Sequence, residues 1–194
     1  MTSVASVSGS GSIVSSVKRL FICVIFAYIN FIVSFYAGEP IKNYFTMLLN
    51  SVPMISVPFA GLVVLESALY IFFISLSYRL AGPIYGIVTA LLTASFFLLM
   101  GPWCGILRPY YFSVFGFVAF IVMGVLVERA NGGFANLAFG LVNWAAAAAF
   151  GVSKVTPLGV VVFSICAFAT GLAADYAARA VSRVVYPHVS RALS

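Results

Sequence analysis

Residues 82–100, GPIYGIVTALLTASFFLLM, form one of several long runs in the chain that contain no charged side chain. A run of about 17–25 mostly apolar residues is long enough for a helix to cross the hydrocarbon core of a bilayer. This stretch therefore predicts a transmembrane helix, and the runs on either side of it predict how many such helices the protein has.

The apolar runs together predict an all-α membrane protein, a bundle of about six transmembrane helices. The predicted spans are residues 20–37, 57–78, 82–100, 110–127, 134–151 and 158–179. Turn-forming sequences such as Gly82-Pro83 and Asn131-Gly132-Gly133 separate them. We expect residues 1–16 to be a disordered Ser/Gly-rich tail, 17–185 the membrane domain and 186–194 a cytoplasmic tail.

The composition indicates that lipid is the outer solvent of this chain. Of its 194 residues, 63% are hydrophobic and 7% are charged, and the mean hydropathy is +1.15. A water-soluble domain of this length needs a polar shell, which ten basic and four acidic residues cannot form. The net charge of +6 comes from basic residues dispersed between apolar runs, so no nucleic-acid surface is predicted.

The positions of lysine and arginine predict the orientation of the bundle. If the N-terminus is cytoplasmic, one side collects Lys18, Arg19, Arg79, Arg129, Arg179, Arg183 and Arg191, and the other collects Lys42, Arg108 and Lys154. This excess agrees with the positive-inside rule. We therefore expect a multi-pass protein of the cell membrane with both termini in the cytoplasm.

Two acidic residues lie inside predicted spans, where a charge costs about 2.5–3.5 kcal/mol on insertion scales. Glu66 is far from any loop, so it either takes part in ligand binding or is a neutralised structural group. Asp175 precedes Arg179 by four residues, which predicts an ion pair on one helical face.

The predicted outer side contains a group of aromatic and polar residues that suits a small planar ligand. Trp103, Arg108 and Tyr111 lie in or just after the loop that precedes the span 110–127. Asn143 and Trp144 lie in the span 134–151. Aromatic rings offer stacking faces, and the polar groups fix orientation. For the loop residues, the alternative is an aromatic belt at the level of the lipid headgroups. With Glu66, these residues are the candidate ligand-binding set.

The chain contains no catalytic motif that we can identify, such as a nucleophile elbow, a phosphate loop or a paired-histidine helix. We therefore predict that it is not an enzyme and needs no cofactor or metal. On the last span, Ala169, Ala173 and Ala177 form a stripe at four-residue spacing. Such a stripe lets helices approach closely, either within the chain or at a docking face for another membrane subunit.

Three motifs carry a resemblance to a known family: Pro58-Phe-Ala-Gly61, Arg79-Leu-Ala-Gly-Pro-Ile-Tyr-Gly86, and Gly101-Pro102 followed by Phe112-Ser-Val-Phe-Gly-Phe-Val118. They resemble the substrate-binding S components of energy-coupling-factor vitamin transporters, most closely the hydroxymethylpyrimidine (thiamin-precursor) branch. The resemblance implies six helices and capture of a micronutrient from outside. It also implies a transmembrane coupling subunit and ATPase subunits as partners. An accessory or structural subunit of a larger membrane complex is the alternative.

Overall fold

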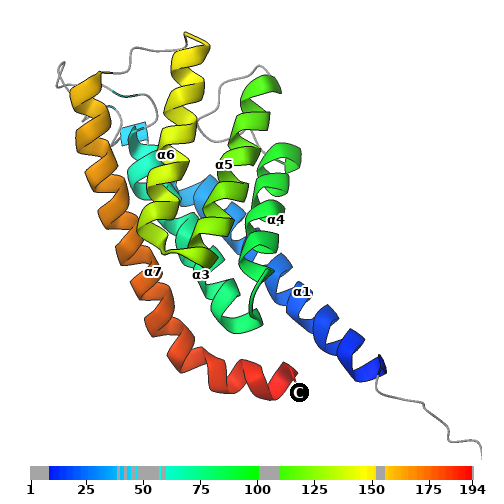
Figure 1. Cartoon of the computed structure of the whole chain (residues 1–194). Coiled ribbons are helices and arrows are strands. Elements are labelled where there is room, and N and C mark those ends of the chain that lie inside the picture. The colour runs from blue at the N-terminus through cyan, green and yellow to red at the C-terminus, as the bar shows by residue number, and fades with distance from the viewer. Residues whose placement is uncertain are drawn as a thin grey trace, which may run out of the picture.

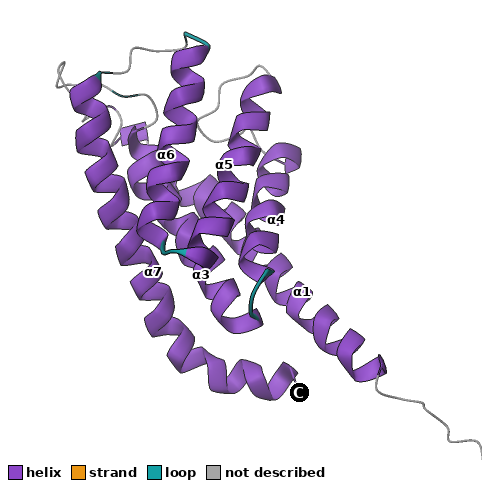
Figure 2. Cartoon of the chain, in the orientation of Figure 1, coloured by secondary structure: helices purple, strands orange, loops and turns teal. Residues whose placement is uncertain are grey.

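The computed structural model describes residues 9–38, 40, 41, 43, 44, 47, 57, 60–100, 110–151 and 156–193. In this part of the chain the regular secondary structure is helical, and short turns join the helices (Figures 1 and 2). The α-helices are α1 (Gly9–Val33), α3 (Ser67–Ala81), α4 (Tyr85–Met100), α5 (Tyr110–Arg129), α6 (Gly132–Ala149) and α7 (Pro157–Leu193). Two π-helical segments are described, η1 (Ser34–Gly38) and η3 (Leu62–Glu66).

Each of the six predicted apolar runs overlaps one of these α-helices, which confirms the all-α prediction. Among the described residues, three helical stretches are long and apolar enough to cross a membrane: Val14–Ala37, Leu62–Ala81 and Pro157–Arg191. Helix α4, which lies in the predicted span 82–100, has 16 residues and is shorter than these three stretches. The three long stretches support a multi-pass membrane protein.

Helix α3 is the centre of the bundle. Helices α1, α4, α5, α6 and α7 surround it, each in contact with α3 and with its neighbour in this order. The side chain of Tyr70 on α3 lies in the main core cluster with Phe97 of α4, Phe120 of α5 and Phe139 of α6. Burial of these large rings holds the surrounding helices against α3.

The outward faces of the helices are apolar. Large hydrophobic side chains are exposed on every α-helix that surrounds α3, including Leu99, which is 80% exposed, and Ile165, which is 66% exposed. A protein surrounded by water rarely exposes apolar side chains over such an area. These faces are therefore suited to contact with lipid, in agreement with the composition.

Helices α6 and α7 approach closely because glycines face each other at their contact. A Cβ atom at Gly171 would overlap the carbonyl oxygen of Gly132, and it would lie 2.7 Å from the Cβ of Asn136. The amide of Asn136 uses this proximity and donates to the carbonyl oxygen of Ala167 at 2.9 Å and to Thr170 Oγ1 at 3.1 Å. Close packing and hydrogen bonds between helices are the main sources of helix association in lipid.

One end of the bundle collects the short turns and both helical termini. At this end, shown at the bottom of Figure 1, α3 turns into α4 and α5 into α6, and the last turns of α7 run beneath the bundle toward α1. Helix α7 has 37 residues, so at 1.5 Å per residue it is about 55 Å long. That length exceeds the bilayer's hydrocarbon core of about 30 Å.

One expectation differs from the structure. Helix α1 begins at Gly9, so residues 9–16 of the expected disordered tail are helical. Helix α7 continues to Leu193, so the segment expected to be a cytoplasmic tail, 186–194, is helical up to that residue. Once an apolar span has formed a helix, each added residue gains a backbone hydrogen bond without a new nucleation step. Composition alone therefore placed the start of the first helix too far inward.

We predict that Gly171→Leu destabilises the protein by about 3 kcal/mol or more, because the added side chain meets the backbone of α6. Ala173→Leu, two residues away on the exposed face of α7, is the matched control and should stay within about 0.5 kcal/mol of wild type. Unfolding of the purified proteins in detergent measures both. Equal losses of stability would contradict the α6–α7 packing described above.

Candidate binding site inside the bundle

Glu66 is the last residue of the π-helical segment η3 and is 1% exposed. The wider turn of this segment is visible in its hydrogen bonds. The backbone N–H of Ser67 donates to the carbonyl oxygen of Leu62, and the Ser67 hydroxyl donates to that of Val63 at 2.5 Å. Short π-helical segments interrupt α-helices and occur frequently at functional sites, because they change the direction of the side chains that follow.

The carboxyl group of Glu66 contacts a cluster of aromatic rings. Tyr70, one turn later, donates its hydroxyl to Glu66 Oε1 at 2.5 Å. The ring of Tyr70 packs at centroid distances of 4.9 Å on Phe120, 5.6 Å on Phe97 and 6.0 Å on Phe139. The carboxyl group of Glu66 is thus hydrogen-bonded to the residue whose ring packs on the other three rings of the cluster.

Helix α6 brings Asn143 and Trp144 to the face that lies against η3. If Gly140 carried a side chain, its Cβ atom would lie 2.6 Å from Val63 Cγ1 and 3.5 Å from the ring of Trp144. These three residues therefore meet where η3 crosses α6. Asn143 donates its Nδ2 to the carbonyl oxygen of Phe139 at 2.8 Å. Both Asn143 and Trp144 are 3% exposed.

The structure thus places three of the six predicted ligand-binding residues, Glu66, Asn143 and Trp144, on two contacting elements, η3 and α6. Tyr111 lies in the first turn of α5, while Trp103 and Arg108 lie outside the described residues. The indole of Trp144 packs in a core cluster with Val63, Phe163 and Ala167.

The three alanines of the predicted docking stripe, Ala169, Ala173 and Ala177, are all exposed. The residues of α7 that pack inside the bundle lie on a different face and include Ala167, Gly171 and Ala178. The stripe is therefore available to another subunit or to lipid. Because these alanines are exposed, they do not form the packing contact within the chain that was the other interpretation of the stripe.

A further buried polar residue lies on α1, outside the predicted ligand-binding set. Asn30 is fully buried and accepts a hydrogen bond from Ser34 on Oδ1 at 3.5 Å, while its Nδ2 has no partner among the described residues. The next residue, Phe31, packs on Phe97 at a centroid distance of 5.3 Å, which places this turn of α1 beside the aromatic cluster. An asparagine inside an apolar run is the same signal that identified Asn143.

At the opposite end of the bundle, the predicted ion pair between Asp175 and Arg179 is confirmed, with Arg179 Nη2 2.8 Å from Oδ2. The carboxylate has two further partners, both on α3. Arg79 Nη2 lies 2.9 Å from Oδ1, and the Ser75 hydroxyl donates to the same oxygen at 2.5 Å. A carboxylate that is 3% exposed in its side chain is thus neutralised by groups from two helices.

We predict that Asp175→Ala destabilises the protein by about 2–3 kcal/mol, because it leaves the largely buried Arg79 without its counter-charge. Arg179→Gln should cost about 1 kcal/mol or less, since the side chain of Arg179 is 47% exposed. Chemical unfolding of the detergent-purified variants gives both values. If the two substitutions were equally costly, Asp175 would not be the residue that joins α3 to α7.

Comparisons of the chain with protein-family models, with curated proteins and with solved structures gave no match. What is established is an all-helical protein with three long apolar helical stretches in its described part. The function is therefore inferred from the arrangement of its own residues.

Proposed function

We propose that this protein is the substrate-capture subunit of an ATP-driven micronutrient importer. In this proposal the chain crosses the membrane six times and binds a small planar ligand that enters from the outer side. The ligand contacts Glu66 together with Asn143 and Trp144 of α6, and Trp103, Arg108 and Tyr111 complete the site. The division of labour is that of the S components that the sequence resembles.

The observation that carries the proposal is the position of Glu66. A carboxyl group inside an apolar span costs about 2.5–3.5 kcal/mol, and such groups in membrane proteins usually mark substrate or ion pathways. Glu66 also belongs to a π-helical segment and contacts the aromatic cluster through Tyr70. The combination of a buried hydrogen-bond acceptor with flat apolar surfaces is typical of sites for small heteroaromatic molecules.

Nearby polar groups add the means to orient such a ligand. The buried Nδ2 of Asn30 has no hydrogen-bond partner among the described residues, and an unsatisfied buried donor is costly unless another group meets it. A ligand with a carbonyl or ring nitrogen acceptor could meet it. Since Glu66, Asn143 and Trp144 are each at most 3% exposed, entry of a ligand requires η3 and α6 to separate.

The energy source in this proposal lies in partner subunits. The sequence has no phosphate loop, so ATP hydrolysis is assigned to ATPase subunits that act through a transmembrane coupling subunit. The first helix has Ala27 alone where S components tend to have an Ala-x-x-x-Ala docking surface, and Ala27 is fully buried. The exposed stripe of Ala169, Ala173 and Ala177 on α7 is the surface that we assign to docking.

The same stripe favours the second candidate function, an accessory subunit that holds a larger membrane complex together without binding a ligand. Exposed small residues at four-residue spacing serve helix association in either case. The two functions differ at Glu66, which matters for ligand binding only in the first. They also differ in whether a small molecule accompanies the purified protein.

We predict that a small molecule co-purifies with the wild-type protein from cells and that Glu66→Gln reduces its amount at least about tenfold, because the amide nitrogen places a donor where the carboxyl group accepts and an unmade buried hydrogen bond costs about 1–3 kcal/mol. Mass spectrometry of the extracted ligand measures this. Glu128→Gln is the matched control, since Glu128 accepts from the backbone N–H groups of Ile84 and Ile87 at the other end of the bundle.

Retention of the same ligand by Glu66→Gln would contradict the assigned site. Absence of any ligand from the folded wild-type protein, together with a larger assembly that Ala173→Leu disrupts, would favour the accessory subunit instead.

A further inference from the structure

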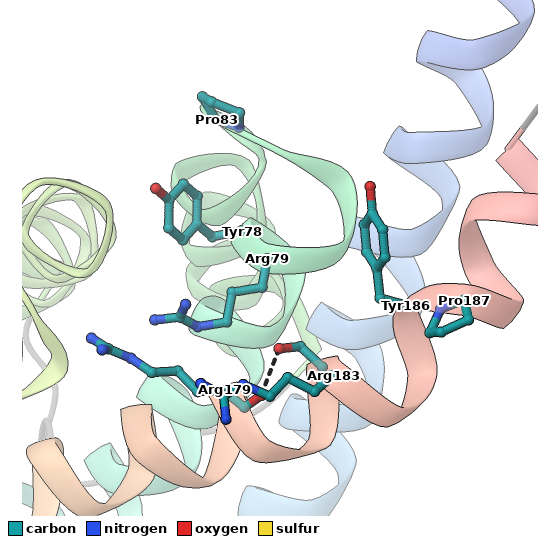
Figure 3. A pocket seen from close by; sticks show the side chains of 8 residues that line it. Tyr78, Arg79, Pro83, Arg179, Arg183, Tyr186 and Pro187 are labelled. Atoms are coloured by element: carbon teal, nitrogen blue, oxygen red, sulfur yellow. Dashed lines mark hydrogen bonds between the residues drawn. The ribbon is translucent and has the colours of Figure 1, made fainter.

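A cavity of about 630 Å³ lies between the end of α3 and the C-terminal half of α7 (Figure 3). Its lining residues are Tyr78, Arg79, Pro83, Arg179, Ser182, Arg183, Tyr186 and Pro187. Arg79 and Arg179 come from facing helices and share Asp175 as their counter-charge. The cavity is distinct from the Glu66 site, because Glu66 directly precedes the N-terminal end of α3 whereas Tyr78 and Arg79 lie near its C-terminal end.

The cavity contains more positive charge than its surroundings neutralise. Three arginines line it, with no acidic residue among the lining. Within the described residues, Asp175 is the one carboxylate that forms ion pairs with them, and it serves Arg79 and Arg179. The carboxylate of Glu128 accepts hydrogen bonds from the backbone N–H groups of Ile84 and Ile87, at the start of α4. Arg183 therefore adds an uncompensated guanidinium to the wall.

A second cavity, of about 360 Å³, continues the first toward α1. Arg79 and Tyr186 line both cavities, and Arg19 of α1 joins the lining of the second. Arg19 Nε is buried and has no hydrogen-bond partner among the described residues, while Arg19 Nη1 lies beside the turn at Gly82. A buried guanidinium donor without an acceptor indicates that an acceptor is missing from the described chain.

The geometry points to a binding site for a phosphate group, formed by Arg79, Arg179 and Arg183 and extended by Arg19. Guanidinium groups bind phosphate through paired hydrogen bonds, which ammonium groups cannot reproduce. The phosphate belongs either to an anionic phospholipid or to a soluble phosphate compound. Basic pockets between helices on the cytoplasmic side typically bind lipid headgroups, and the positive-inside pattern predicts that this end is cytoplasmic.

The test uses the full-length protein in detergent with three probes: phosphatidylglycerol, phosphatidylcholine and inorganic pyrophosphate. We expect Arg183→Gln to weaken binding of the anionic probe about tenfold, the effect of losing one charge-assisted contact. Arg183 is exposed, so its replacement should leave the unfolding temperature unchanged. Arg129→Gln is the matched control, since Arg129 ends α5 at the same end of the bundle but lines neither cavity.

The outcomes separate the two sources of phosphate. Tight binding of phosphatidylglycerol over phosphatidylcholine, with no competition by pyrophosphate, assigns a lipid headgroup, whereas competition by pyrophosphate assigns a soluble phosphate compound. Arg183→Lys keeps the positive charge but loses the paired N–H donors of the guanidinium group, so this variant should bind the anionic probe more weakly than wild type. Equal losses in Arg183→Gln and Arg129→Gln, or no binding of either anionic probe to wild type, would overturn the proposal.

Discussion

The carboxylate of Asp175 is the group on which one end of this bundle depends. In lipid a charge has no water to solvate it, so its neutralisation must come from within the protein. Here Arg79 and Ser75 of α3 and Arg179 of α7 supply it. These bonds fix which face of α7 meets α3. One turn earlier on that face, Gly171 then meets Gly132, so α6 packs against α7 in the same register.

The two ends of the bundle consequently have different chemistry. The end near Asp175 contains the arginines and the cavities between α3, α7 and α1. Toward the other end, Glu66 of η3 contacts the aromatic cluster through Tyr70, and Val63 of η3 packs with Trp144 of α6. Ligand capture at one end and an anion site at the other are separate proposals, because they use different residues and respond to different substitutions.

The sequence predicted the helices well because their signal is local. Apolar composition over a window identifies a span, and the four-residue spacing of Asp175 and Arg179 identifies an ion pair. The second partner of Asp175, Arg79, is 96 residues away in the chain. No periodicity in the sequence brings these two residues together, since their contact depends on how α3 packs against α7.

The candidate site was predictable only in part for the same reason. Residues that are polar inside apolar runs, such as Glu66 and Asn143, are visible in the sequence, but the π-helical turn at η3 depends on local backbone geometry that composition does not encode. The sequence identifies Trp144 as a candidate ligand contact, whereas its packing against Val63 and Phe163 depends on how η3 crosses α6. The exposure of the alanine stripe likewise depended on the rotation of α7, which Asp175 determines.

The central claim is that the contact between η3 and α6 binds a small planar ligand. The chain has two tryptophans, so the titration is run on the wild type and on a Trp103→Phe variant, which keeps an aromatic ring at that position of the proposed site and assigns the change to Trp144. Titration with a panel of water-soluble vitamins and their heteroaromatic precursors should give a saturable change in Trp144 emission for at least one compound, and adding Glu66→Gln should abolish it. A folded protein whose Trp144 emission changes with none of these compounds, or changes equally with Glu66→Gln present, would contradict the claim.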